Sequence, residues 1–329
     1  MEIVLEDELR AAVPLDAAAV TVIEDGFTQL SQGTVQTPPI MRMEFPEQNG
    51  EVDVKAAWVE GLDQFAIKLS SGFFNNTVKG LRSSSGLMVV LSAITGYPEA
   101  LLLDQGYLTD VRTAAAGAIA AKYLANDPIH TVGILGSGTQ ARGQLHALRL
   151  VRQFDRVLVF SPHRNHAQRF AEEMHHTLEV DVHVAASAEA VVREADVVVS
   201  CTPATQPLID AAWLHPGLHI TAMGSDAEFK QELDPKIFRL ADKVCCDVTA
   251  QCLRLGELHH AYDAGYIRPV DVTELGDITA GKILGRTHRD HITVCDLTGT
   301  GVQDTMIAVY ALERVHDYKQ WALVNGPAS

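Results

Sequence analysis

Hydrophobic positions in the first third of the chain alternate with polar ones over short runs that are separated by turn residues. Such runs occupy residues 40–45, 51–59, 64–71, 86–93 and 97–104. A period of two is typical of strands covered on one face. Two helix-like stretches precede them, at about 6–12 and 15–32. Helices followed by several strands in antiparallel order predict an α+β domain.

A second pattern begins at residue 131, where apolar runs alternate with helix-like stretches. The predicted strands are 131–135, 156–160, 181–184, 196–200, 218–222, 243–247 and 292–296, with helices at 139–153, 165–176 and 187–193. This alternation predicts a parallel sheet with helices on both faces. The predicted fold class is therefore α/β: a Rossmann doubly wound parallel sheet plus an α+β N-terminal domain.

Two further helices bear on the domain organisation. A helix rich in small residues is predicted at 107–125, and a long helix ends the chain after the glycine-rich "LTGTG". Because the last helix follows the nucleotide-binding pattern, it can return to the first domain. We predict an α+β substrate and dimerisation domain from residues 1–118 with 304–329, and a dinucleotide-binding domain from 119–303.

The segment "VGILGSGTQA", residues 132–141, places glycines where a buried strand ends and a helix begins. Gly136 allows a tight turn, and Gly138 has no Cβ to keep a phosphate away. Ala141 is small enough for the helix to lie close to the strand. The N–H groups of a helix that starts at Thr139 would then face a pyrophosphate. The alternative is an ordinary turn between a strand and a helix.

The strand at 156–160 bears on the choice between NAD and NADP. Sites that prefer NAD place an acid at the end of this strand, about 20 residues after the glycines. Asp155 has that spacing, but it starts the strand and so lies at the wrong edge of the sheet. The strand ends in "SPHR", without an acid, and Arg164 could contact a 2′-phosphate. This favours NADP, unless Arg164 is only a solvated residue that opens the next helix.

Composition limits the possible partners. The formal net charge is −16, which disfavours nucleic acid and anionic membranes. The first residues, "MEIVLEDELR", are acidic, and no apolar run approaches the roughly 20 residues of a membrane span. We therefore expect a cytoplasmic protein. The five cysteines form no C-x-x-C pair, and the histidines lack ligand spacing, so we expect no metal.

Several charged residues stand in settings that suggest chemistry. Lys68 alternates with apolar residues in "FAIKLSSG", and a lysine that is partly buried there would need an anion, such as a substrate carboxylate. Arg112 and Arg42 could hold a carboxylate through two hydrogen bonds, and Glu51 could bind an ammonium. Asp226 follows the strand at 218–222, at the edge where doubly wound folds bind ligands. Each of these could instead be a solvated charge or, for Asp226, a helix cap.

The chain resembles the ornithine cyclodeaminase/μ-crystallin family. The resemblance runs through "FAIKLSSGFFNN", "LLLDQGYLTDVRTAAAGAIAAKYLA", "VGILGSGTQA", "MGSDAEFKQELD", "ELGDITAGKILGR" and "LTGTGVQD". These blocks cover nearly the whole chain in the family's order. Residues 49–76 look most like the branch named for ectoine utilisation. The resemblance implies a Rossmann domain and an α+β domain whose sheets pair in a homodimer.

The resemblance also implies roles for single residues. Arg42, Lys68 and Arg112 match positions that hold the substrate's α-carboxylate, Asp226 matches the acid that moves a proton, and Glu51 matches an acid that holds a distal amine. The residues implied to contact the cofactor are Ser85, Arg112, Gly136, Gly138, Thr139, Gln140, Arg164, Lys230 and Thr298. Many relatives carry Pro-Gly before the lysine at position 230, whereas this chain has Glu228 and Phe229.

Three functions follow from these parts. A cyclodeaminase oxidises a diamino acid, releases ammonia and returns the hydride, as expected in ectoine or diamino acid catabolism. An imino acid reductase of the iminosuccinate-reductase or alanine-dehydrogenase type consumes NAD(P)H instead. The third possibility is a protein that binds NADP(H) without turnover. The substrate in each case is a small amino or imino acid, and strands that are apolar on both faces predict a homodimer.

Overall fold

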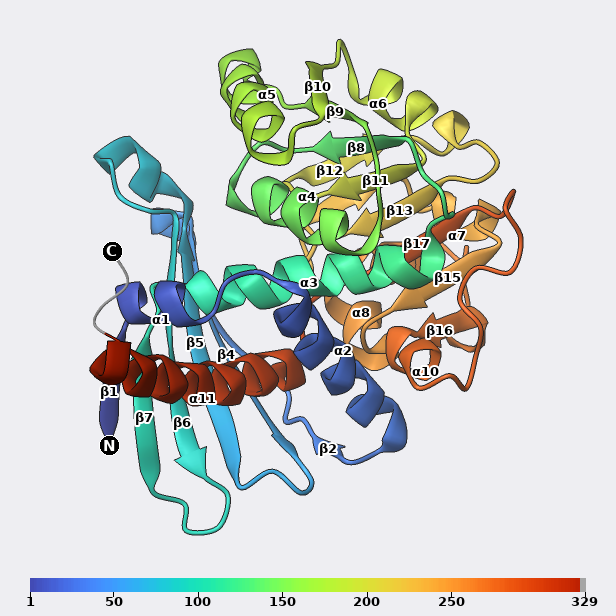
Figure 1. Ribbon diagram of the computed structural model, residues 1–329. Helices are drawn as coiled ribbons and strands as arrows, with labels where there is room; N and C mark the ends of the chain where they lie inside the picture. Colours follow the sequence, from blue (N-terminus) through green and yellow to red (C-terminus); the bar gives the residue numbers. More distant parts are fainter. Residues whose placement is uncertain (326–329) are drawn as a thin grey trace. The chain divides into compact units, whose positions relative to one another are not determined.

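The computed structural model describes residues 1–325, which form two compact units. The first unit contains residues 1–112 and the segment that begins at Thr300, and the second contains Thr113–Gly299. The boundary at residue 112 falls inside helix α3 (Tyr107–Leu124). Each unit is described separately below, with element labels as in Figure 1.

The first unit is built on a seven-stranded sheet in the order β1-β7-β6-β5-β4-β2, with β3 paired to β4. Its strands are β1 (Glu2–Leu5), β2 (Val35–Gln36), β3 (Met41–Phe45), β4 (Gly50–Val59), β5 (Gln64–Phe73), β6 (Ser84–Ser92) and β7 (Pro98–Leu103). The neighbours from β2 to β7 are antiparallel, as the turn residues predict. The sequence did not reveal strand β1, which pairs with β7 in parallel at one edge of the sheet.

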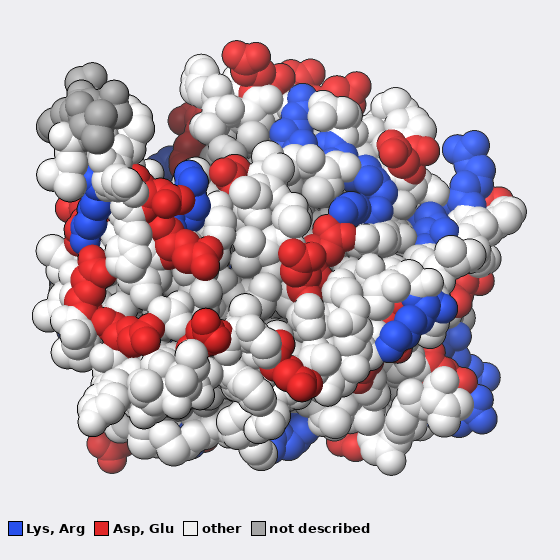
Figure 2. Space-filling view, turned by 60° about the horizontal axis from the view of Figure 1, so that its bottom comes forward, with Lys and Arg blue, Asp and Glu red and all other residues white. Residues whose placement is uncertain are grey.

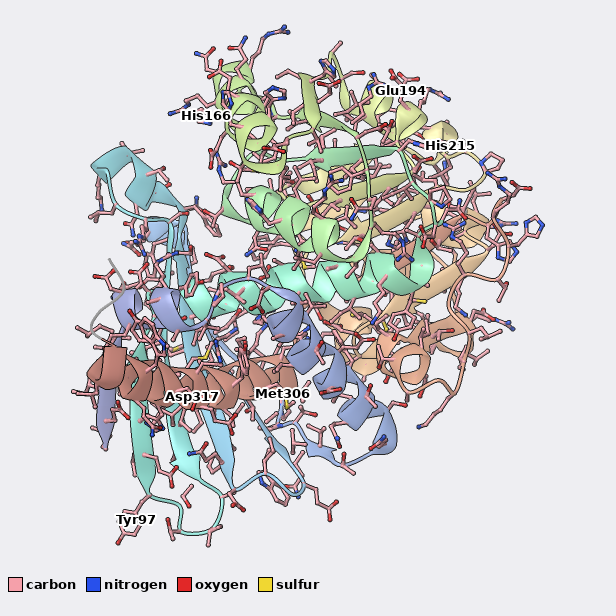
Figure 3. The ribbon with its side chains drawn as sticks, in the orientation of Figure 1. Tyr97, His166, Glu194, His215, Met306 and Asp317 are labelled. Carbon is pink, nitrogen blue, oxygen red and sulfur yellow. The ribbon has the colours of Figure 1, made fainter. Side chains whose placement is uncertain are left out.

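One face of this sheet is covered by helices. Helix α11 (Gly301–Asn325) packs on β4, β5 and β6 and on helices α1 (Glu6–Ala12) and α2 (Ala17–Gln32), so the terminal helix does return to the first unit. The buried residues of this face include Ala57, Ala66 and Met88. Met306 on α11 packs close to Gly26 of α2, while Tyr97 projects from the β6–β7 hairpin (Figure 3).

The start of α11 is fixed against two strands. The Thr305 hydroxyl donates to the carbonyl of Ala57 at 2.7 Å and accepts the Ala66 N–H at 3.1 Å. Gly301 comes so close to β4 that a Cβ would lie 2.2 Å from the Ala56 carbonyl oxygen. These contacts determine which residues of the first turn face the sheet.

The second unit contains an eight-stranded sheet in the order β10-β9-β8-β11-β13-β17-β15-β16. The strands are β8 (Thr131–Leu135), β9 (Arg156–Phe160), β10 (Asp181–Val184), β11 (Val197–Ser200), β13 (His219–Ala222), β15 (Lys243–Cys246), β16 (Val272–Glu274) and β17 (Thr293–Asp296). All neighbours are parallel. The strand order reverses after β8, which is the switch point of a Rossmann fold, so the predicted fold class is confirmed.

Helices cover both faces of this sheet, as Figure 1 shows. They are α4 (Thr139–Val151), α5 (Arg164–Leu178), α6 (Ala188–Glu194), α7 (Ile237–Leu240), α8 (Thr249–Leu255), α9 (Glu257–Asp263) and α10 (Leu275–Thr279), besides the end of α3. Alternate residues of β8 divide between two buried clusters: Val132 and Ile134 join one, and Leu135 joins the other. The apolar run therefore marks a strand covered on both faces.

The sequence did not reveal several short elements. Strands β12 (Thr205–Ile209) and β14 (Gln231–Leu233) form a separate two-stranded parallel sheet in the second unit.

Among the described residues, no helix combines the length and the apolar character needed to cross a membrane. Acidic side chains are spread over the face drawn in Figure 2 rather than gathered in one patch.

Candidate functional site

Charged side chains continue the buried face of the first unit's sheet beyond the start of α11. On β4, Asp53 and Lys55 alternate with less buried residues in the same register as Ala57 and Val59. Lys55 lies opposite Lys68 of β5, and Asp53 lies opposite Arg42 of β3. Residues two apart on a strand point to the same side of the sheet, so these four side chains share one face.

Lys68 and Arg112 share a single buried carboxylate, that of Asp304 on α11. The Lys68 ammonium donates to Asp304 Oδ1 at 2.9 Å, and Arg112 Nε lies 3.1 Å from the same oxygen. Lys68 is 1% exposed and Asp304 is 0% exposed. Lys68 is therefore buried as its sequence setting suggested, and the anion beside it is a carboxylate of the protein rather than one of a substrate. Two cations around one anion leave an excess of positive charge, which suits a bound carboxylate.

Burial is the main cause that lowers the pKa of Lys68 to about 7, and the neighbouring charges of Arg112 and Lys55 add to it. Asp304 opposes this by favouring the charged lysine. In turn, Lys68 and Arg112 lower the pKa of Asp304 against the effect of its own burial. Near neutral pH, Asp304 is thus charged, while Lys68 is close to its midpoint.

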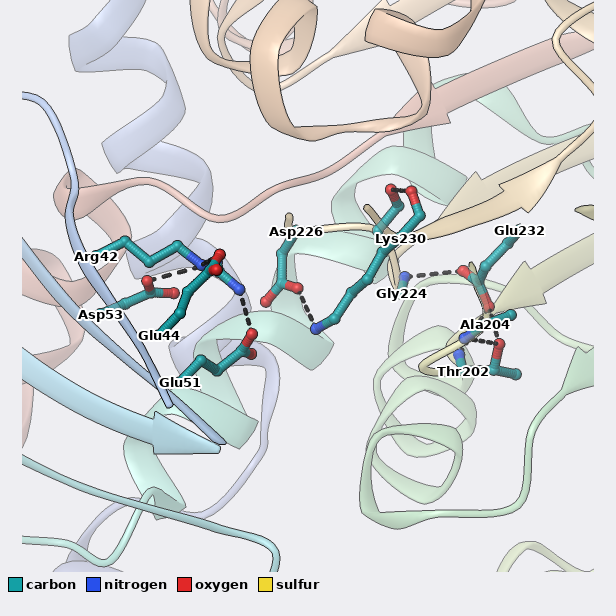
Figure 4. Close-up of polar contacts among 11 residues, drawn as sticks. Arg42, Glu44, Glu51, Asp53, Thr202, Ala204, Gly224, Asp226, Lys230 and Glu232 are labelled. Atoms are coloured by element: carbon teal, nitrogen blue, oxygen red, sulfur yellow. Dashed lines mark hydrogen bonds and ion pairs between the residues drawn. The ribbon is translucent and has the colours of Figure 1, made fainter. Parts of the chain in front are cut away.

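Arg42 is surrounded by three carboxylates (Figure 4). Its guanidinium pairs with Glu51, lies 3.5 Å from Asp53 and lies 3.6 Å from Glu44. The sequence predicted that Arg42 binds a carboxylate and that Glu51 binds an ammonium, and the structure pairs the two with each other. One cation among three anions makes this end of the sheet negative. A distal amine of a substrate would find compensating charge here.

The glycine-rich loop after β8 has the geometry that a dinucleotide requires. Gly136 has φ of 116°, and its N–H donates to the Phe160 carbonyl at 2.9 Å, which fixes the turn. A Cβ on Gly136 would lie 3.0 Å from the Cys201 carbonyl oxygen, so a side chain is disfavoured there. A Cβ on Gly138 would meet nothing within 4 Å, so packing within the protein does not require that glycine.

A phosphate at the N-terminus of α4 would account for Gly138. Gly138 is the N-cap of α4, and no side chain caps the helix. Arg142 of α4 stabilises the loop by donating hydrogen bonds to the carbonyls of Ser137 and Gly138 at 2.7 and 3.1 Å. Thr139 and Gln140 form the first turn, where backbone N–H groups and the helix dipole favour an anion. The loop therefore fits the pyrophosphate of a dinucleotide.

The end of β9 places Arg164 as the sequence predicted. Arg164 is the first residue of α5 and is exposed, and it forms no ion pair within the described part of the chain. Asp155 precedes β9 and so lies at the opposite end of the strand from the loop that follows Phe160. Its position agrees with the argument that it cannot hold the ribose.

Asp226 follows β13 and forms an ion pair with Lys230, whose ammonium lies 2.6 Å from Asp226 Oδ1. Figure 4 shows this pair together with a second carboxylate, Glu232, which fixes the loops on either side. Glu232 accepts the N–H groups of Thr202 and Gly224 at 2.7 and 2.9 Å. Burial raises the pKa of Glu232. The loop that carries Asp226 is thus tied to the loop after β11.

Thr298 lies in the loop after β17, and the neighbouring carboxylate Asp247 holds it in place. Asp247 accepts the N–H groups of Thr298 and Gly299 at 2.8 and 2.7 Å. The neighbouring Asp296 is completely buried, and burial raises its pKa to about 8. Loops after β8, β11, β13 and β17 all lie at the carboxyl edge of the sheet, where doubly wound folds bind ligands.

Ser85 was predicted to contact the cofactor, and the structure shows its partner within the protein. Its hydroxyl donates to the Gln105 side-chain oxygen at 2.8 Å, within the first unit. The proposed contact of Ser85 with a cofactor stays a prediction.

Sequence reasoning missed four carboxylates that organise these groups: Asp304, Asp247, Glu232 and Glu257. Glu257 accepts the N–H groups of Glu232 and Leu233, and its own pKa is raised well above the ordinary value by burial. A signal was present for two of them. Asp304 is the one acid in the first turn of the last helix, and Asp247 directly follows the strand "KVCC".

Comparison with known proteins adds a strong finding. Residues 3–319 match the sequence model of the "Ornithine cyclodeaminase/mu-crystallin family". An uncharacterized cyclodeaminase of Sinorhizobium fredii is 49% identical over 96% of both chains. Among solved structures, the Thermococcus litoralis Delta(1)-pyrroline-2-carboxylate reductase in complex with NADH and L-proline matches with a TM-score of 0.92 and 28% identity, covering 97% of this chain and 98% of that one. An archaeal alanine dehydrogenase dimer with bound NAD matches with a TM-score of 0.89 and 32% identity, covering 100% and 98%.

Proposed function

The chain belongs to the ornithine cyclodeaminase/mu-crystallin family, and from that premise we propose that it is an NAD(P)-dependent enzyme acting on a small amino or imino acid. The hydride would move at the carbon that carries both nitrogen and carboxylate. The observation that carries this proposal is the pair of buried cations, Lys68 and Arg112, around the single carboxylate of Asp304. Buried charge in excess calls for an anionic ligand, and a carboxylate fits both donors.

The residues present divide the work between them. The Gly136–Gly138 loop and the start of α4 hold the pyrophosphate, and Lys68 and Arg112 hold the substrate's carboxylate. Asp226 exchanges the proton that distinguishes an amine from an iminium. A nicotinamide cofactor supplies or accepts the hydride when it is bound. Fixing the carboxylate orients the substrate, and orientation accounts for a large part of such catalysis.

Within this frame we propose a cyclodeaminase that acts on a diamino acid. Glu44, Glu51 and Asp53 gather negative charge around Arg42, so a distal ammonium would be compensated at that end of the sheet. The likeness to a protein named as a cyclodeaminase supports this reading. The resemblance of residues 49–76 to the ectoine-utilisation branch supports a short diamino acid, such as 2,4-diaminobutyrate.

A reductase of imino acids is the second candidate. Arg42 engages Glu51, so that this acid already has a cationic partner within the protein. The structural likeness to a pyrroline-2-carboxylate reductase and to an alanine dehydrogenase also supports this alternative. In that case the enzyme would consume NAD(P)H with an imino acid, or with a keto acid and ammonia.

One assay separates these functions. The protein is incubated with NAD⁺ or NADP⁺ and a diamino acid, or with NADH or NADPH and either iminosuccinate or pyruvate plus ammonia. Nicotinamide absorbance and ammonia are then followed together. A cyclodeaminase releases ammonia without a net change in absorbance, and a reductase oxidises the cofactor in proportion to its substrate. No turnover with any of these substrates would contradict both proposals and favour a cofactor-binding protein.

Glu51→Gln sharpens the assay. This variant removes the charge that would hold a distal ammonium and keeps the shape of the side chain. We expect it to lose activity on the diamino acid. An equal loss on an imino acid with no second amine would show that Glu51 acts through Arg42 rather than on the amine.

A further inference from the structure

Asp304 is a carboxylate that the proposed reaction does not use directly, and yet it connects the two cations that the reaction needs. It lies in the first turn of α11, is 0% exposed, and accepts the Lys68 ammonium at 2.9 Å. The same oxygen lies 3.1 Å from Arg112 Nε. Lys68 comes from β5 and Arg112 from α3, so one carboxylate joins three elements.

The position of this carboxylate is fixed by its own helix. Thr305, the next residue, bonds to both β4 and β5, and Gly301 allows the helix to approach the Ala56 carbonyl. The backbone of Asp304 is therefore held against β4 and β5, at a place from which its carboxylate reaches Lys68. A geometry that is held in this way is suited to orienting the cations on either side of it.

The other charged groups that face Lys68 mostly oppose its charge. Lys55 of β4 is its direct partner across the strand pair, and Arg112 of α3 is close, so two cations repel it. Asp104, which follows β7, is a second acid that interacts electrostatically with Lys68. Burial raises the pKa of Asp104, and the charge of Lys68 opposes this rise. Asp304 is thus the carboxylate that bonds to Lys68 directly and favours its charged form.

We propose that Asp304 is a positioning residue that increases the charged share of Lys68 and holds it next to Arg112, so that both cations can receive the substrate's carboxylate. The proposal rests on the function proposed above and adds a residue that acts through its neighbours. A lysine in a site of this kind, with two cations nearby, binds a carboxylate only while it is protonated. Without Asp304, repulsion and burial would leave Lys68 neutral at physiological pH.

The test is a pH titration of lysine side chains by NMR. The chain has only nine lysines, so ¹³Cε-lysine labelling gives a spectrum that can be resolved, and the signal that vanishes in Lys68→Met identifies Lys68. We expect Lys68 to titrate near pH 7 in the wild type. Asp304→Asn, which has nearly the same shape, should move this midpoint down by about one pH unit or more, a tenfold or larger change in the protonation equilibrium. Asp317→Asn, an exposed acid on the same helix (Figure 3), should leave it in place.

A midpoint that is equal in the wild type and in Asp304→Asn overturns the proposal. If Asp304→Asn does not fold, Lys68→Met/Asp304→Asn removes both charges, and recovery of folding by this double variant supports the same coupling; failure to recover counts against it.

A second readout separates this proposal from the proposed function. L-alanine and L-2,4-diaminobutyrate are each added at pH 8 with NADP⁺, and the Lys68 signal should shift more in the wild type than in Asp304→Asn. If neither acid moves the signal in the wild type although the two midpoints differ, Lys68 binds the carboxylate of neither acid. That result contradicts the proposed function for these two substrates, whereas the effect of Asp304 on the charge of Lys68 stands.

Discussion

Asp226 is the acid on which the proposed chemistry depends most directly. Its carboxylate is about a third exposed, at 37%, and its partner Lys230 is almost buried, at 7%. An accessible carboxylate at the carboxyl edge of a parallel sheet can exchange protons with a bound molecule. The Lys230 ammonium, 2.6 Å away, holds this carboxylate in place.

Asp226→Asn keeps the shape of this side chain and removes the proton acceptor. We expect the turnover number to fall by about 10²–10⁴-fold, the usual contribution of general acid–base catalysis. The dissociation constant of the cofactor should barely change, because the glycine loop binds the pyrophosphate. Steady-state kinetics and a cofactor titration measure the two quantities. Glu228→Gln, an exposed acid in the same loop, is the matched control, and an equal effect of both variants would argue against a specific role for Asp226.

Arg164 carries the predicted preference for NADP over NAD. Arg164→Ala should weaken NADP(H) binding by about 10- to 100-fold, since a charged hydrogen bond contributes roughly 1.5–3 kcal/mol, and should leave NAD(H) binding nearly unchanged. Calorimetric titration of both cofactors measures this. Arg169→Ala, an exposed arginine on the same helix, controls for a general loss of positive charge. If the wild type binds NAD(H) more tightly, the preference is refuted.

The loop after β8 contains two glycines, and the structure gives a different reason for each. Gly136 has a backbone angle that side chains rarely adopt and a carbonyl close to any Cβ, whereas Gly138 has ordinary angles and open space. Gly138→Ala should therefore leave thermal stability unchanged and weaken cofactor binding by about tenfold or more, since its methyl group stands where a phosphate approaches.

Gly136→Ala is the comparison for that variant. It should reduce both stability, by about 1–3 kcal/mol, and cofactor affinity, because strain in the turn moves the loop itself. Thermal denaturation and cofactor titration on both proteins test the pair. Loss of stability in Gly138→Ala with unchanged affinity would mean that the loop packs against protein and not against a ligand.

The buried Asp296 on β17 should make the stability of the protein depend on pH. Its pKa is raised to about 8 in the folded chain by burial, so it keeps its proton between pH 5 and 7, whereas the unfolded chain has lost it. The folded state then binds more protons than the unfolded state, so the free energy of unfolding falls as pH rises. The expected slope from this group is at most about 1.4 kcal/mol per pH unit.

Asp296→Asn mimics the protonated acid and should remove this contribution. Denaturant unfolding of both proteins at pH 5, 6 and 7 gives the difference directly, and other groups largely cancel in it. A difference that stays constant over this range would show that Asp296 is charged when folded.

Sequence patterns predicted helix α11 and most strands of the parallel sheet, because a long helix and apolar strand runs that alternate with helices are recognisable locally. They missed strand β1. Strand β1 has four residues and pairs with β7, where Glu2 lies opposite Ala100, so nothing local predicts its parallel direction. The same limit applies to the site. Lys68 stood out as a polar residue in an apolar strand, but its partner Asp304 is 236 residues away and is brought close only by the return of α11.

The sequence also did not reveal which charged residues pair with each other. Arg42 and Glu51 were each assigned to a group of the substrate, and the fold places them against each other. Their spacing of nine residues on two strands puts them together only if the β3–β4 hairpin has the register it does. Residue type indicates which chemistry is possible, and register determines which partner is present.

The sheet of the first unit has an apolar surface on the face that the helices of that unit do not cover. Residues that alternate with the buried ones form it, among them Ile67, Val89 and Leu101, which follow one another across β5, β6 and β7. Leu69 is 39% exposed, and Ile3 and Leu5 at the sheet edge are each 54% exposed. A continuous apolar surface of this kind marks an interface. The likeness to an alanine dehydrogenase that was solved as a dimer supports a second copy of the chain as its partner.

We therefore expect a homodimer of twice 35.7 kDa by analytical ultracentrifugation at micromolar concentration. Leu69→Asp places a charge on the apolar face, and burying an unpaired charge in an interface costs several kcal/mol. The dissociation constant of the dimer should therefore rise by at least about 100-fold. Ile94→Asp, at an exposed position in the hairpin after β6, is the control and should sediment as the wild type does. A wild type that sediments as a monomer contradicts the dimer. A dimer that Leu69→Asp leaves intact would place the interface elsewhere, since a buried, unpaired carboxylate destabilises an interface.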